Sequence, residues 1–153
     1  MATINDFLKA VGHVVIETRD ADTGELKDRR EIHNLTVTLG KNWIAARCGP
    51  NPPAALSHMA IGTDGTAPAA GDALLHAEIA RVALDVAGGS IAGAVLTLQA
   101  TFGAGVGTGA LQEAGLFNAA GLNAGTLTNR VTFGVVTKGV NDVTTITWTI
   151  TIQ

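Results

Sequence analysis

Residues 142–152 constrain the fold of this chain more than any other segment. Large apolar side chains and threonines alternate along it, with Ile146, Trp148, Ile150 and Ile152 in one set and Thr145, Thr147, Thr149 and Thr151 in the other. A period of two, with β-branched residues in both sets, is typical of a half-buried β-strand. The segment is therefore predicted to be a strand with Trp148 in the core.

Similar strand patterns recur upstream, separated by glycine-rich turns. Strands are expected at residues 13–18, 26–33, 57–63, 78–86, 91–102, 111–118 and 126–138. With 153 residues, the chain is long enough for one domain with its own core. We therefore expect a mainly β protein, a single antiparallel β-sandwich or jelly-roll-like domain over residues 12–153 with about eight or nine strands.

Several details of this sandwich follow from the pattern. Gly88 and Gly89 predict a tight turn that pairs residues 78–86 with residues 91–102. In the strand at 126–138, alternation predicts four inward side chains, Leu127, Val131, Phe133 and Val135. The predicted aromatic core consists of Phe102, Phe117, Phe133 and Trp148. Residues 34–48 fit two interpretations, a strand around Val37 or two turns of helix before the breaker at Gly49 and Pro50.

The N-terminus differs from the rest of the chain. Ile4, Phe7, Leu8 and Val11 have helical spacing, which predicts a short amphipathic helical arm at residues 1–11. A free helix of this length is marginal in water. The arm is therefore expected to dock, either on its own domain or on a neighbouring subunit.

The charge pattern narrows the choice of partners. A net charge of −3 argues against nucleic acid, because phosphate binding needs clustered Lys and Arg. The basic residues Lys27, Arg29 and Arg30 alternate with acidic ones, in a polar hairpin at 13–33 that we expect to project from the body or to lie at an edge. Together with the apolar side chains of Ile4, Phe7 and Leu8, these three cations are the predicted protein–protein contact.

The sequence offers little for catalysis. Glu78, Arg81, Glu113 and Arg130 lie in otherwise apolar strands. Two carboxylates of this kind can serve a glycosidase, but pairing with the arginines is the favoured interpretation, because neither charge is then buried alone. We therefore expect no enzyme, no cofactor, no metal and no small-molecule substrate. No apolar run reaches the about 18 residues of a membrane span, and no signal-peptide pattern opens the chain.

Six strings follow one another in order along the chain. They are Ile32 to Leu35 leading into Gly40, Ile61 to Pro68, Leu74 to Arg81, Glu113 to Phe117, Arg130 to Lys138 and Thr147 to Ile150. In this order they resemble the small structural proteins of tailed bacteriophages, including virion and tail-fibre-type domains. The resemblance extends over residues 30–152.

This resemblance implies a non-enzymatic virion component that folds in the host cytoplasm. A free-standing β-domain suits a capsid decoration (cement) protein, commonly a trimer, or another ring, that contacts the major capsid protein. The alternatives are a neck, tail or baseplate protein that attaches a fibre, and a carbohydrate-binding β-sandwich. The absence of Tyr and the inward Trp148 disfavour the last alternative, because sugar sites need exposed aromatic rings.

Overall fold

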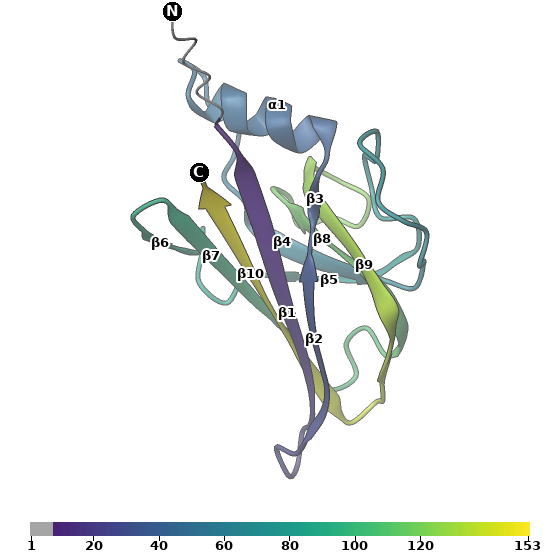
Figure 1. Ribbon diagram of the computed structural model, residues 1–153. Coiled ribbons are helices and arrows are strands. Elements are labelled where there is room, and N and C mark those ends of the chain that lie inside the picture. The colour runs from purple at the N-terminus through teal and green to yellow at the C-terminus, as the bar shows by residue number, and fades with distance from the viewer. Residues whose placement is uncertain (1–7) are drawn as a thin grey trace, which may run out of the picture.

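The computed structural model describes residues 8–153, in which strands surround a shared core and one helix lies across their end (Figure 1). The elements are β1 (Ala10–Asp20), β2 (Leu26–His33), β3 (Leu35–Thr36), α1 (Thr38–Arg47), β4 (His58–Gly62), β5 (Glu78–Ala83), β6 (Ser90–Ala92), β7 (Val95–Phe102), β8 (Gly109–Phe117), β9 (Leu127–Lys138) and β10 (Asp142–Ile152).

The strands form two antiparallel sheets. Sheet A has the order β2-β1-β10-β7-β6, and sheet B has the order β3-β9-β8-β4-β5. Residues 8–153 are thus mainly β with one short helix, which confirms the predicted fold class at this level and is compatible with a β-sandwich.

Four connections carry the chain from one sheet to the other. The step from β2 to β3 joins the two sheets along one edge, and the segment between β5 and β6 joins them along the opposite edge. The other two are the loop from β7 to β8 and the turn from β9 to β10. The helix α1 lies at one end of the sheets, and the turn between β1 and β2 lies at the other (Figure 1). We call these the helix end and the turn end.

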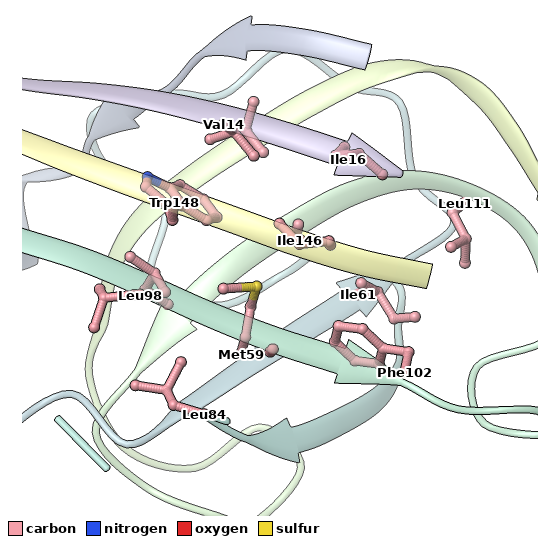
Figure 2. Packing of buried hydrophobic residues seen from close by; sticks show 14 of the residues in the cluster. Val14, Ile16, Met59, Ile61, Leu84, Leu98, Phe102, Leu111, Ile146 and Trp148 are labelled. Carbon is pink, nitrogen blue, oxygen red and sulfur yellow. The ribbon is translucent and has the colours of Figure 1, made fainter. Parts of the chain in front are cut away.

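Alternation along β1, β10 and β7 builds one wall of the core. Val14 pairs with Trp148, which in turn pairs with Leu98, and this row is fully buried. Met59 and Ile61 of β4 face this wall from sheet B (Figure 2). The predicted aromatic residues lie here or next to it: Phe102, Phe117 and Trp148 are 0% exposed, and Phe133 is 9% exposed.

The inward face of β9 differs from the prediction at one position. Val135 is 49% exposed, and Val136 is buried instead. Between the pairs Val136↔Leu111 and Thr132↔Glu113, the chain advances by four residues in β9 but by only two in β8. The regular alternation is interrupted at this bulge: Val131 and Phe133 are buried before it, whereas Val136 is buried after it.

The predicted hairpin between residues 78–86 and 91–102 does not form. β5 pairs with β4 in sheet B, whereas β7 pairs with β10 and β6 in sheet A. Leu84, at the start of the crossing, is buried in the core, and this burial holds the connection between the sheets. The predicted tight turn at Gly88 and Gly89 is present, with φ of +73° and +74° and with the Gly89 N–H donating to the Val86 carbonyl at 2.9 Å, but it leads from sheet B into β6 of sheet A. The hairpin turn between β6 and β7 lies at Gly93, where φ is +58°.

Residues 34–48 contain both a short strand and a helix. Val37 is the extended residue before α1 and donates its N–H to the Thr128 carbonyl. Gly40, in the first turn, lies so close to the same carbonyl that any side chain would collide with it. The helical interpretation is therefore correct from Thr38 onward, and the strand interpretation fails at Leu39, which lies in α1.

The N-terminal arm is described only from Leu8. Ile4 and Phe7 lie outside the described residues. Leu8 and Lys9 belong to no helix, and Ala10 and Val11 already form part of β1. The expected helix therefore does not extend over residues 8–11, because β1 continues its pairing with β10 to Ala10↔Ile152.

Candidate functional site

The buried ion pair of Arg130 and Glu113 lies on the outer face of sheet B. Arg130 donates from Nε and Nη2 to Glu113 Oε2 at 3.0 and 2.8 Å, and both side chains are 0% exposed. The two residues come from the neighbouring strands β9 and β8. Each charge therefore has its counter-ion beside it, as the sequence-based ion-pair hypothesis requires.

The same pair fastens the connection between β4 and β5, residues 63–77, onto the sheet. Arg130 Nη1 donates to the Thr66 carbonyl at 3.1 Å and to the Asp72 carboxylate at 2.9 Å. The Glu113 carboxylate accepts the backbone N–H groups of His76 and Ala77 at 3.1 and 2.7 Å. We call this arrangement the Arg130 clamp.

His76 and two aspartates extend the Arg130 clamp to the surface. The His76 imidazole lies between them: Nδ1 is 3.3 Å from the Asp64 carboxylate, and Nε2 is 3.3 Å from the Asp72 carboxylate. Hydrogen bonds from the Thr66 side chain and backbone lower the pKa of Asp64. Burial raises the pKa of Asp72, but hydrogen bonds from Ala69, His76 and Arg130 outweigh it, so the net pKa is below its ordinary value. Sequence reasoning missed this group, because no regular spacing links residues in an irregular loop.

A second clamp is formed by Arg81 and Glu78 on β5. Arg81 Nε and Nη2 donate to the two Glu78 carboxylate oxygens at 2.7 and 2.8 Å, and both side chains are 1% exposed. The guanidinium also lies 3.7 Å from the centre of the Phe117 ring and donates to the carbonyls of Ala119 and Ala124. This Arg81 clamp therefore holds residues 118–126 over the outer face of sheet B.

The contacts within the two clamps determine what the carboxylates of Glu113 and Glu78 can do chemically. Glu113 is enclosed by Arg130 and two backbone N–H groups, and Glu78 by Arg81. A glycosidase acid or base must reach a glycosidic oxygen or a water. Neither carboxylate offers an accessible oxygen for that step, so the arrangement is structural.

The cationic residues Lys27, Arg29 and Arg30 lie along β2, the edge strand of sheet A. Each has an acidic neighbour: Lys27 contacts Asp142 at 2.5 Å, Arg29 contacts Glu31 at 2.5 Å, and Arg30 contacts Asp28 at 2.7 Å. The hydrogen bond to Lys27 and the Gly139 N–H lower the pKa of Asp142. These pairs balance the positive charges of β2. Charged side chains on an edge strand also disfavour its pairing with the edge of another sheet.

The expectation of a projecting hairpin at 13–33 is wrong. β1 pairs with β10 over its whole length, from Ala10↔Ile152 to Asp20↔Asp142, and is therefore an inner strand of sheet A. A hairpin that projects would need both strands free of the body, whereas here only the turn reaches past the sheet.

The structure also separates the two halves of the predicted contact. Lys27 and Arg29 lie toward the turn end, where β2 pairs with residues 17–19 of β1, while Leu8 precedes the helix end of β1. At about 3.3 Å per residue, Leu8 lies about 30–35 Å from these two cations along β1. Ile4 and Phe7, the other apolar members of the predicted contact, lie outside the described residues, so the contact itself stays a prediction.

An apolar groove opens at the helix end instead. It has a volume of about 240 Å³ and lies between α1, the hairpin of β6 and β7, and the last residues of β10. Its walls are Trp43, Ile44, Leu56, Ile91, Gly93, Ala94, Val95, Leu96, Thr128, Asn129, Ile150 and Ile152. We call it the end groove.

A second hollow of about 570 Å³ adjoins the end groove. The two share Ile44 and Ile152, and the second is also lined by Leu8, Lys9, Ala10, Asn34, Leu35, Thr36 and Lys41. Ile91 stands at the groove with 77% of its surface exposed. No sequence signal pointed to this site, because its walls come from segments that only the fold brings together.

Within residues 8–153, no group of three or more His, Cys, Asp or Glu side chains is arranged to hold a metal ion. No helix in this part of the chain has the length and apolar character needed to cross a membrane. Comparison of the chain with family models, curated proteins and solved structures gave no match.

Proposed function

We propose that this protein is a non-enzymatic structural component of a tailed-phage virion, and specifically a capsid decoration protein built on a jelly-roll-like β-sandwich. One structural observation supports the proposal. The strings that resemble phage structural proteins are far apart in the sequence, yet their residues meet in one hydrogen-bonded network.

Four of the strings meet at the Arg130 clamp. Arg130 bonds to Glu113 and to the Thr66 carbonyl, and Glu113 accepts the N–H groups of His76 and Ala77. These residues belong to the strings at 130–138, 113–117, 61–68 and 74–81. Four of the six strings therefore supply the parts of one clamp.

The first and last strings also meet. Asn34 accepts a hydrogen bond from the Trp148 indole, and Leu35 pairs with Arg130 across β3 and β9. The resemblance therefore covers the residues that close sheet B and join it to sheet A. A single structural unit accounts for the order of the strings along the chain.

The surface suits attachment better than recognition of sugars. Trp148 is 0% exposed and cannot serve as a stacking platform for a sugar ring. The end groove, with the exposed Ile91 beside it, offers an apolar contact of the kind found at protein interfaces.

The copy number per particle tests this proposal. Purified particles of a phage that encodes the chain are separated on a gel, and the band is quantified against the major capsid protein. Decoration predicts hundreds of copies per particle. About six to twelve copies would indicate the neck, tail or baseplate alternative, since those parts are closed rings. Absence of the chain from purified particles would refute a virion role.

A further inference from the structure

We propose that the end groove binds residues 1–7 of a second copy of this chain, with Ile4 and Phe7 inserted among its apolar walls. The inference goes beyond the proposed virion role and does not depend on it, because it concerns how the purified chain associates with itself.

The end groove is chemically suited to such a segment. Trp43, Ile44, Leu96, Ile150 and Ile152 give it an apolar lining. Ile91 remains 77% exposed beside it, which leaves a large apolar side chain without cover in the single chain. Exposed apolar surface of this kind, next to a groove, marks a binding site for another apolar group.

The position of the chain at Leu8 indicates where residues 1–7 depart. Lys9 and Gln153 exchange two backbone hydrogen bonds, at 2.7 and 2.8 Å, which continue the pairing of β1 with β10. The backbone is therefore still held in the strand direction at Lys9. Leu8 lines the adjoining hollow and is 79% exposed, so the described chain reaches the rim of the site at Leu8.

The direction of β1 favours binding of the segment by a neighbouring copy over binding by its own chain. A chain held in the β1–β10 ladder up to Lys9 is directed past the end of β10, whereas the end groove lies back between β10, α1 and β6. Entering its own groove would require the segment to reverse direction within a few residues. A second copy placed at the helix end receives it without that reversal, as in exchange of terminal segments between subunits.

Charge is also complementary. Residues 1–7 carry one acidic side chain, Asp6, between the apolar residues Ile4 and Phe7. The adjoining hollow is lined by Lys9 and Lys41. An acidic residue next to an apolar side chain therefore matches an apolar groove with a basic rim, which favours this segment as the occupant.

Mixing two defective variants tests the exchange. Phe7→Asp replaces an apolar side chain of the segment and leaves the groove unchanged. Ile91→Asp replaces an apolar side chain of the groove and leaves the segment unchanged. Ile91 is exposed, so its replacement leaves the core intact. Val86→Asp is the matched control, because Val86 is 59% exposed but does not line the groove.

Association is followed by light scattering and sedimentation, and Trp43 fluorescence reports on the groove over the constant background of the buried Trp148. We expect the unmodified chain and Val86→Asp to self-associate, and each groove or segment variant to do so at least tenfold more weakly. Equal mixing of Phe7→Asp with Ile91→Asp should restore a 1:1 complex with a shifted Trp43 spectrum.

Three outcomes would overturn the proposal. If the unmodified chain and all variants are monomeric, and the Trp43 emission differs between the unmodified chain and Phe7→Asp at every protein concentration, the segment binds the groove of its own chain. Self-association that survives both substitutions would place the interface elsewhere. Variants that weaken association but do not complement each other on mixing would exclude insertion of one copy's segment into another's groove.

Discussion

The indole N–H of Trp148 donates a hydrogen bond to the Asn34 side-chain oxygen at a distance of 2.9 Å. Trp148 lies in the core of sheet A, and Asn34 lies in the step from β2 to β3 that joins the sheets along one edge. A buried indole N–H needs an acceptor. The bond therefore fixes the position of this connection against the core.

Replacement of Trp148 should unfold a large fraction of the protein. Trp148→Ala removes the largest fully buried side chain and should lower the free energy of unfolding by about 3–5 kcal/mol. Trp148→Phe keeps most of the packing and should cost less, through the lost hydrogen bond to Asn34. Urea denaturation measures both changes. An unchanged midpoint for Trp148→Ala would contradict the packing of β10.

Gly12 should be intolerant of even a methyl group. A side chain there would occupy the position of the Asn34 amide, so Gly12→Ala must displace the acceptor of the Trp148 bond. We expect a loss of about 1–3 kcal/mol, the usual effect of an unsatisfied buried polar group. Gly134→Ala is the control, because Gly134 has open space around its Cα. Equal thermal stability of the two variants would argue against the close packing of Asn34.

The Arg130 clamp should show strong coupling in a double-mutant cycle. Arg130→Met leaves the Glu113 carboxylate buried without its counter-ion and should cost about 3–5 kcal/mol. Adding Glu113→Gln to this variant removes the unpaired charge, so the double variant should lose less than the sum of the single losses. Arg30→Met, at the exposed edge, should leave the urea midpoint nearly unchanged. Additive effects at Arg130 and Glu113 would mean that the pair is not coupled.

Stability should fall in acid partly through Asp142. The hydrogen bonds from Lys27 and from the Gly139 N–H lower its pKa in the folded state below the ordinary 3.8. The unfolded chain therefore binds more protons at this group as the pH falls, so its contribution is complete above about pH 5 and is lost as the pH falls through the folded pKa. Asp142→Asn should flatten the decline of the urea midpoint between about pH 5 and pH 3, while Glu25→Gln at the exposed turn should not. Parallel acid profiles for Asp142→Asn and the unmodified chain would refute this linkage.

The sequence pattern was informative where strands are regular. The alternation in residues 142–152 predicted the buried row of Trp148 and its neighbours, because a half-buried strand imposes a period of two. It failed at Val135, where the bulge in β9 changes the parity of the inward side chains. A bulge leaves no signal in a single pattern of apolar residues, since it depends on the partner strand.

Long-range arrangement accounts for the other differences. Gly88 and Gly89 resembled a hairpin turn, but burial of Leu84 directs the chain across to sheet A. The types of residue in the two clamps were recognisable in the sequence, whereas the attached connections at 63–77 and 118–126 were not. The end groove was beyond sequence reasoning altogether, because Trp43, Ile91 and Ile150 come from three separate elements.

Attachment of the purified protein to particles that lack it tests the central claim most directly. The unmodified chain is titrated onto such particles, and the bound copies are counted after sedimentation. A decoration protein should bind saturably at hundreds of copies per particle and at a fixed ratio to the major capsid protein. Failure of the folded protein to sediment with particles at any concentration would contradict the account.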